Sequence, residues 1–114
     1  MRIVEDPLNR ETIEAVTQLI VERFEPEQII MFGSCARGEV DENSDLDLLV
    51  VLPHNDEQGH EGHGIRLAIA ERFLLPVDVL IRSAEVVAKY RQDPNSMISR
   101  MLESSEVLYD RHAA

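Results

Sequence analysis

The stretch Asp45-Leu46-Asp47-Leu48-Leu49-Val50-Val51-Leu52 contains most of the longest uncharged apolar run of the sequence. This run starts at Leu48 and ends at Pro53. Polar and apolar residues alternate in its first half, and its second half is continuously apolar. This pattern predicts a strand over 45–52 that lies in the centre of a sheet and has one polar face at its start.

Helix and strand signals surround this stretch on both sides. The predicted elements are a helix over 9–24 that starts at Asp6-Pro7 or Asn9, strands over 28–32 and 76–81, a helix over 65–73, helical stretches after Ser83 around 86–90 and 97–102, and a strand over 107–109. The connection between the first two strands is too short for a crossover helix, so these strands are expected to be antiparallel. The order predicts an α/β (α+β) fold with a mixed β-sheet flanked by helices.

Length and composition favour one ordinary domain over residues 1–114. Hydrophobic residues make up 44% of the 114 residues, which is typical of globular domains. The single cysteine, Cys35, excludes an internal disulfide and a zinc–cysteine cluster. No apolar run approaches the roughly 20 residues of a membrane helix, and the N-terminus lacks a signal-peptide pattern, so a cytoplasmic protein away from membranes is expected.

The charge is strongly acidic and unevenly distributed. Eleven basic and twenty-two acidic residues give a net charge of −11, which argues against direct binding of nucleic acid. Residues 39–61 contain eight carboxylates and no Lys or Arg. Such a run indicates either a solvated loop or a site for hard divalent cations.

Residues 54–64 contain three glycines and no aliphatic residue. This composition predicts a flexible, solvated loop. His54, His60 and His63 suggest a metal site, but a glycine-rich setting offers no anchored second shell of contacts, so the loop interpretation is favoured over the ligand interpretation.

Three aspartates are the candidate catalytic and metal-ligating residues. Asp45 and Asp47 are two residues apart at the start of a strand, so their side chains project to the same face with Cα atoms roughly 6.5–7 Å apart. Asp78 occupies the first half of another apolar strand. If the two strands are neighbours, the three carboxylates meet at one sheet edge and can hold two Mg²⁺ ions for phosphoryl transfer. The alternative is that these strand ends simply lie in solvent.

The residues after the first strand, Gly33-Ser34-Cys35-Ala36-Arg37-Gly38, are candidates for binding a nucleotide. Gly33 permits a tight turn and a close approach of backbone amides to phosphate, and Ser34 can donate its hydroxyl. Arg37 is a weaker candidate, because it could equally be an ordinary surface residue. Proximity in sequence to Asp45 strengthens the nucleotide interpretation, since a triphosphate needs donors for its phosphates and carboxylates for its metals in one place.

The motif Gly33–Gly38 followed by Ser44-Asp45-Leu46-Asp47-Leu48 resembles the Gly-Ser-x-Ala-Arg-Gly and Ser-Asp-x-Asp-Leu signature of the DNA polymerase β-like nucleotidyltransferase superfamily. More narrowly, the short length, Asp78 within its strand and the closing 107–109 strand resemble the minimal nucleotidyltransferases. This group includes the MntA-like antitoxins that are paired with HEPN-domain toxins. Cys35 occupies a variable position of the motif, and the His- and Gly-rich segment 54–64 is unusual for the family.

The resemblance implies a polymerase β-like fold and a Mg²⁺-dependent transfer of AMP from ATP to a hydroxyl, with tyrosine of a partner HEPN toxin as the expected acceptor. It implies that Gly33, Ser34 and, less specifically, Arg37 contact the triphosphate. Asp45, Asp47 and Asp78 match the metal-binding carboxylates. A hetero-oligomer with the toxin is expected.

Two other functions stay open. A catalytically silent antitoxin would neutralise the HEPN partner by binding alone, although the three retained aspartates count against it. A small-molecule nucleotidyltransferase of the aminoglycoside-modifying type would need an additional helical domain to hold its acceptor. The acceptor is therefore expected to come largely from another chain.

Overall fold

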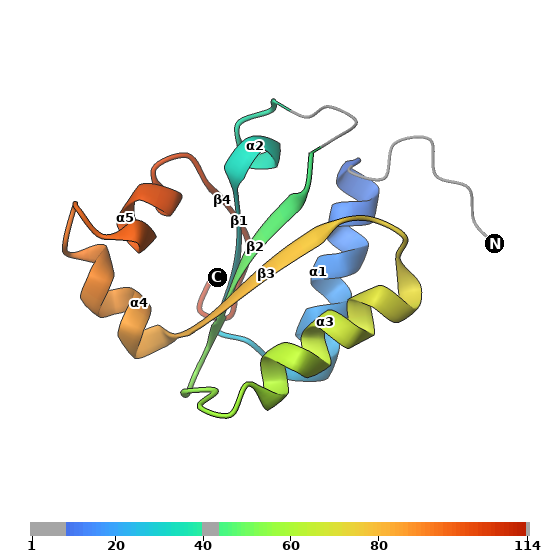
Figure 1. The fold of residues 1–114 in the computed structure, drawn as a ribbon, viewed down its shortest axis with the longest axis horizontal. Helices are drawn as coiled ribbons and strands as arrows, with labels where there is room; N and C mark the ends of the chain where they lie inside the picture. The colour runs from blue at the N-terminus through green and yellow to red at the C-terminus, as the bar shows by residue number, and fades with distance from the viewer. Residues whose placement is uncertain (1–8, 40–43, 114) are drawn as a thin grey trace.

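The computed structural model describes residues 9–39 and 44–113 (Figure 1). Its elements are α1 (Arg10–Phe24), β1 (Gln28–Phe32), α2 (Gly33–Ala36), β2 (Leu46–Leu52), α3 (His60–Arg72), β3 (Val77–Ser83), α4 (Ala84–Arg91), α5 (Met97–Leu102) and β4 (Glu106–Asp110). The predicted strands and the predicted α/β order are confirmed, and the turn predicted at Gly33 is the single helical turn α2.

Within these described ranges, four strands form one mixed sheet in the order β3-β2-β1-β4. β1 pairs antiparallel with β2, as expected from the short connection between them, and it also pairs antiparallel with β4. β2 and β3 are parallel, because α3 crosses from the end of one strand to the start of the other. The starts of β2 and β3 therefore lie at the same end of the sheet.

Helices cover both faces of this sheet, with α1 and α3 on one face and α4 and α5 on the other (Figure 1). The α1–α3 face buries Leu48, Val50 and Leu52 of β2, whereas the α4–α5 face buries Leu49 and Val51. Both faces of β2 are thus apolar, which explains its continuous apolar run. No helix of the described residues is long and apolar enough to cross a membrane.

Two helix starts that the sequence indicated are confirmed. The Asn9 side chain accepts a hydrogen bond from the Thr12 backbone N–H at 2.8 Å at the start of α1. Ser83 caps α4, where its hydroxyl oxygen accepts from the Val86 N–H at 3.2 Å. Both contacts satisfy backbone donors that would otherwise be unpaired in the first turn. The other candidate start of α1, Asp6-Pro7, lies outside the described residues.

The predicted solvated loop over 54–64 is wrong in its second half, because α3 begins at His60. The carboxylate of Asp56 accepts the backbone N–H groups of Glu61 at 3.1 Å and Gly62 at 2.8 Å, which caps the first turn. A Cβ at Gly62 would lie 3.0 Å from Ile81 Cγ1, and one at Gly64 would lie 3.2 Å from Phe24 Cε1. These two glycines therefore allow close packing of a helix rather than flexibility of a loop.

Candidate active site

Asp47 and Asp78 are directly opposite each other on the neighbouring parallel strands β2 and β3. Side chains of paired residues on parallel strands project from the same face of the sheet. Asp45 precedes Asp47 by two residues, just before β2 begins, and thus approaches the same face. The Asp47 side chain is half-buried, and Asp45 and Asp78 are exposed. The strand neighbourhood that the metal-site hypothesis required is therefore present.

The electrostatics of Asp47 reflect this arrangement. Burial raises the pKa of the Asp47 carboxyl above its ordinary value, and the nearby negative charges of Asp78 and Asp45 raise it further. Arg37 acts in the opposite direction and lowers this pKa. Asp47 is thus within electrostatic reach of both other carboxylates and of the guanidinium.

Gly33 lies against Asp47, since β1 ends at Phe32, which pairs with Asp47 across the antiparallel strands. The backbone of Gly33 has a φ of +75°, which disfavours residues with a side chain. A Cβ at this position would collide with Asp47 Oδ2 and lie 3.2 Å from Cγ. Gly33 is required here for two reasons, and only the backbone conformation was foreseeable from the sequence.

α2 continues from Gly33 and lies next to the start of β2. The thiol of Cys35 is buried and donates a hydrogen bond to the backbone carbonyl of Asp45 at 3.3 Å. This contact ties the turn that carries Ser34 to the residue that opens the Asp-x-Asp motif. Sequence reasoning assigned Cys35 no role, because a single cysteine in a variable position carries no signal of such a contact.

The other two predicted nucleotide-binding residues flank this turn. Ser34 is half-buried in α2, and its backbone carbonyl accepts the Glu39 N–H at 2.9 Å. Arg37 is exposed and pairs with the Glu39 carboxylate at 3.1 Å from Nε to Oε2. Because Arg37 also acts on the pKa of Asp47, its guanidinium is near the carboxylates as well as the turn. These positions fit a role in contacting phosphates, which stays a prediction.

The donor set of three carboxylates suits a hard divalent cation such as Mg²⁺. Burial raises the pKa of Asp47 most, and a cation would relieve the repulsion from Asp78 and Asp45 that raises it further. Among the described residues, which include all three aspartates, no group of three His, Cys, Asp or Glu side chains is gathered closely enough to hold a metal ion. The three-ligand site therefore stays a prediction that the strand pairing supports.

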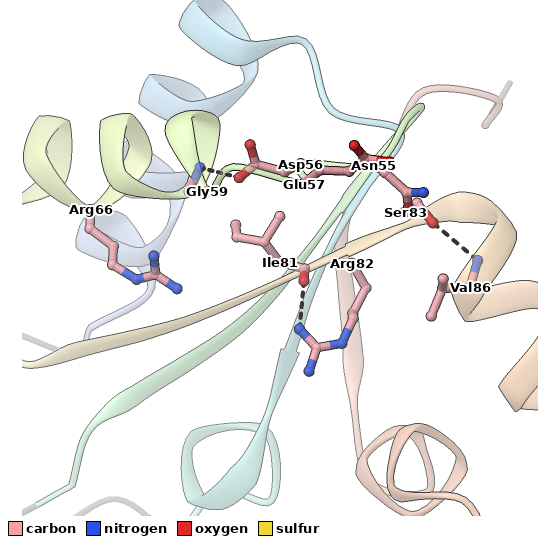
Figure 2. Close-up of a pocket in the computed structure, with 10 residues that line it drawn as sticks. Asn55, Asp56, Glu57, Gly59, Arg66, Ile81, Arg82, Ser83 and Val86 are labelled. Carbon is pink, nitrogen blue, oxygen red and sulfur yellow. Dashed lines mark hydrogen bonds between the residues drawn. The ribbon is translucent and has the colours of Figure 1, made fainter.

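A cavity of about 280 Å³ lies at the opposite end of β2 and β3, away from these aspartates (Figure 2). Asp56 and Glu57 form one side of it, and Arg66 and Ile81 form another. The Arg66 guanidinium donates to the backbone carbonyl of Val79 at 2.7 Å. The acidic and basic side chains of this cavity balance each other, so it lacks the excess of either charge that a triphosphate or a cation would need.

Comparisons with known proteins agree with this architecture. The family model described as nucleotidyltransferase domain matches residues 13–105. A protein of Methanocaldococcus jannaschii that carries the name "putative protein adenylyltransferase" is 38% identical over 55 residues, which are 48% of this chain and 54% of that protein. The alignment thus spans about half of the relative's length.

A solved structure shares the fold. It is described as a "putative nucleotidyltransferase" from Sulfolobus solfataricus, and it superposes with a TM-score of 0.57 over 87% of this chain and 78% of its own. The sequence identity is 19%, so this likeness concerns the fold alone. It supports the expected mixed sheet flanked by helices.

Proposed function

Because the chain belongs to the nucleotidyltransferase domain family, we propose that it transfers AMP from ATP to a hydroxyl of a partner protein in a Mg²⁺-dependent reaction. The expected acceptor is a tyrosine of a HEPN-domain toxin, which the transfer would neutralise, so the chain would act as an antitoxin in a complex with that toxin. The observation that carries the nucleotidyl transfer is the pairing of Asp47 with Asp78 beside the Gly33 turn.

The proposed reaction is a displacement at the α-phosphorus of ATP. The acceptor oxygen forms a bond to this phosphorus, the bond to the bridging oxygen of the β-phosphate breaks, and pyrophosphate leaves. Asp78 is exposed at the start of β3 and can take the proton from the attacking hydroxyl. Asp47 and Asp45 carry the negative charge that binds the metal, while Gly33, Ser34 and Arg37 orient the triphosphate.

Asp45, Asp47 and Asp78 would hold the Mg²⁺ ions. When bound, these ions neutralise the phosphate charges and stabilise the attacking and leaving oxygens. The half-buried position of Asp47 supports this assignment, because its charge is costly without a compensating cation. The exposed positions of Asp45 and Asp78 leave these two carboxylates open to ligands from solvent.

A protein acceptor is supported by the archaeal relative, which is named for adenylyl transfer to protein. The open setting of the Asp78 carboxylate also suits a large acceptor, since no described side chain buries it.

Incubation of the chain with a HEPN partner and ATP labelled in the α-phosphate tests the proposal. We expect the label to appear on the partner, with none transferred from γ-labelled ATP, because pyrophosphate carries the γ-phosphate away. A partner that binds tightly but stays unlabelled would favour the silent antitoxin. Label that appears on small hydroxyl compounds and never on protein would favour the small-molecule enzyme.

A further inference from the structure

A second cavity lies between the end of β3 and helices α4 and α5, and we call it the α4–α5 groove. It has a volume of about 300 Å³ and is lined chiefly by Arg82, Val86, Tyr90, Ser96, Met97 and Ile98. This volume is at the lower limit for a small-molecule site, roughly 300–1,000 Å³. The groove therefore has room for one large side chain rather than for a whole cofactor.

Two apolar side chains of the groove are open to solvent. Tyr90 is 42% exposed and Met97 is 59% exposed, so both belong to the exposed large hydrophobic side chains of the described residues. Tyr90 is on α4 and Met97 opens α5, and both side chains border the same hollow. Aromatic and methionine side chains around a pocket are typical of protein–protein contact sites.

The charge around the groove is opposite to that of the rest of the chain. Residues 82–102 contain four basic and two acidic residues, whereas the remaining residues of the 114 contain seven basic and twenty acidic. Lys89, Arg91 and Arg100 are exposed on α4 and α5, as is Glu85 of α4. The excess of positive charge therefore comes from these helix surfaces beside the hollow, because the charged residues of the lining itself, Arg82 and Asp93, balance each other. Asp93 is the carboxylate in the lining, and it accepts the Asn95 N–H at 2.9 Å in the connection between the helices.

Arg82 joins the groove to the cavity of Figure 2, since it lines both. Its guanidinium points away from Asp56 and Glu57 and donates to the backbone carbonyl of Ile81 at 2.7 Å (Figure 2). A guanidinium has five N–H donors, so one hydrogen bond leaves most of them available for a carboxylate.

The groove opens on the same face of the sheet as the three aspartates. Arg82 and Asp78 are both on β3 and are four residues apart, so their side chains project to one face with Cα atoms about 13 Å apart. Leu80, between them, packs against the core under α4 and α5, which identifies the face. A protein that is bound in the groove would thus lie over the sheet face that carries the aspartates, about 13 Å along β3 from Asp78.

We propose that the α4–α5 groove is a docking surface for an acidic segment of a partner protein. One apolar side chain of that segment occupies the hollow between Tyr90 and Met97, and carboxylates beside it pair with Arg82 and with the basic residues of α4. Charge complementarity selects the occupant, because an acidic segment is repelled by most of this chain and attracted here. This inference rests on the proposed function in one respect only, namely that the partner bound in the groove is the protein that accepts AMP.

Selection of random heptapeptides, displayed on phage, against the immobilised full chain tests the docking surface without nucleotide. We expect enrichment of peptides in which carboxylates flank an aromatic or long aliphatic residue. Synthetic copies of these peptides should bind the wild-type chain and lose at least about tenfold in affinity on Arg82→Glu and on Met97→Glu. The second variant places an acid in the first turn of α5, where the helix tolerates it.

Matched controls separate the groove from general charge effects. Arg72→Glu reverses an exposed arginine at the end of α3, and Leu74→Glu removes an apolar side chain that is 84% exposed. Both should bind the peptides as the wild type does. If Arg82→Glu unfolds the chain, as far-ultraviolet circular dichroism would show, Arg82→Gln replaces it.

Four outcomes would overturn the proposal. The first is that acidic peptides are not enriched, and the second is that the control variants lose as much peptide affinity as the groove variants. The third is that an oligouridylate RNA binds the wild-type chain and no longer binds the groove variants. The fourth is that the chain associates with itself and that Arg82→Glu disrupts this association. The third would assign the groove to nucleic acid and the fourth to a second copy of the chain. None of these results bears on nucleotide transfer, so failure here is distinguishable from failure of the proposed function.

Discussion

Asp47 and Asp78 are paired across the parallel strands β2 and β3, although a loop and the whole of α3 separate them in the sequence. Each residue lies near the start of its strand, so the pair is at the end of the sheet where β1 turns at Gly33. Like charges on opposite residues repel each other. The fold therefore holds an unfavourable electrostatic arrangement at one end of its sheet, which is typical of a functional site.

The repulsion predicts that Asp47→Asn stabilises the chain at neutral pH. The pKa of Asp47 is raised in the folded state by burial and by Asp78 and Asp45, so ionisation of this group destabilises the fold. Stability from the protonated form is complete below the ordinary value of 3.8 and is lost as the pH rises through the folded-state pKa. The Tm of the variant should exceed that of the wild type at pH 7 by a few degrees, and the difference should vanish towards about pH 4.

Thermal melts at both pH values measure this difference. Glu71→Gln removes an exposed carboxylate from α3 and serves as a control for the loss of one negative charge in Asp47→Asn. A rise in Tm that is equal for the two variants would show that Asp47 experiences only the overall charge of the chain.

The contact of Gly33 with Asp47 predicts a large cost for Gly33→Ala. The left-handed backbone conformation costs roughly 1–2 kcal/mol with a Cβ, and the collision with Asp47 adds to this. Gly38→Ala is a matched control, because Gly38 has a φ of +74° and nothing within 4 Å of an added Cβ. Chemical denaturation of both variants should show the larger loss at Gly33.

A double variant isolates the contact. In an Asp47→Ala background, the loss caused by Gly33→Ala should fall to that caused by Gly38→Ala, since only the backbone cost remains. An unchanged loss in that background would mean that the two residues do not meet in the folded protein.

The cap of α3 predicts a pH-dependent effect of Asp56→Ala. This change removes an acceptor from two backbone N–H groups in the first turn and should destabilise the chain by about 1 kcal/mol. The hydrogen bond from Gly62 lowers the pKa of Asp56, so its stabilising contribution is present above the ordinary pKa. It is lost as the pH falls through the folded-state value, and the two proteins should then become equally stable.

Urea denaturation at pH 7 and at acidic pH checks this expectation. Glu57→Ala removes the adjacent exposed carboxylate and the same charge, and it should have little effect at either pH. An equal destabilisation by both variants would remove Asp56 from its capping role.

The sequence predicted most of the fold because its signals are local. The alternating start and apolar end of β2 come from a strand that is covered on both faces, and Asn9 and Ser83 cap helices within their own neighbourhoods. The sequence did not predict the start of α3, because Gly62 and Gly64 pack closely against Ile81 and Phe24, which are distant in the sequence. Local composition there resembles a loop, although tertiary packing makes a helix.

The candidate site divides in the same way. The Asp45–Asp47 spacing on one strand face was readable from the chain, as was the need for a turn at Gly33. Asp78 lies next to Asp47 because β2 and β3 are adjacent and parallel. The sequence did not show that these two strands are neighbours, so the position of Asp78 could be predicted only under that assumption. The contacts of Cys35 with Asp45 and of Gly33 with Asp47 are tertiary, so no local sequence pattern predicts them.

The different settings of the aspartates predict that Asp78→Asn separates nucleotide binding from transfer. Asp78 is exposed at the sheet edge and is proposed to take the proton of the attacking hydroxyl, whereas Asp47 is half-buried beside the Gly33 turn. The Asn variant should therefore keep most of its affinity for Mg-ATP and lose transfer by roughly 10²–10⁴-fold. Asp47→Asn should lose both, because it removes the carboxylate nearest the proposed triphosphate site.

Calorimetric titration with Mg-ATP and incorporation of α-label, measured on the same preparation of each variant, distinguish the two residues. Glu71→Gln, which removes an exposed carboxylate from α3 outside both the aspartate site and the α4–α5 groove, should leave both measurements unchanged. Transfer by Asp78→Asn at the wild-type rate would exclude Asp78 from the site and leave Asp45 and Asp47 as the only carboxylates of the motif. Equal loss of Mg-ATP affinity in Asp78→Asn and Asp47→Asn would instead assign Asp78 to metal binding alone, because a proton acceptor is not needed until the hydroxyl attacks.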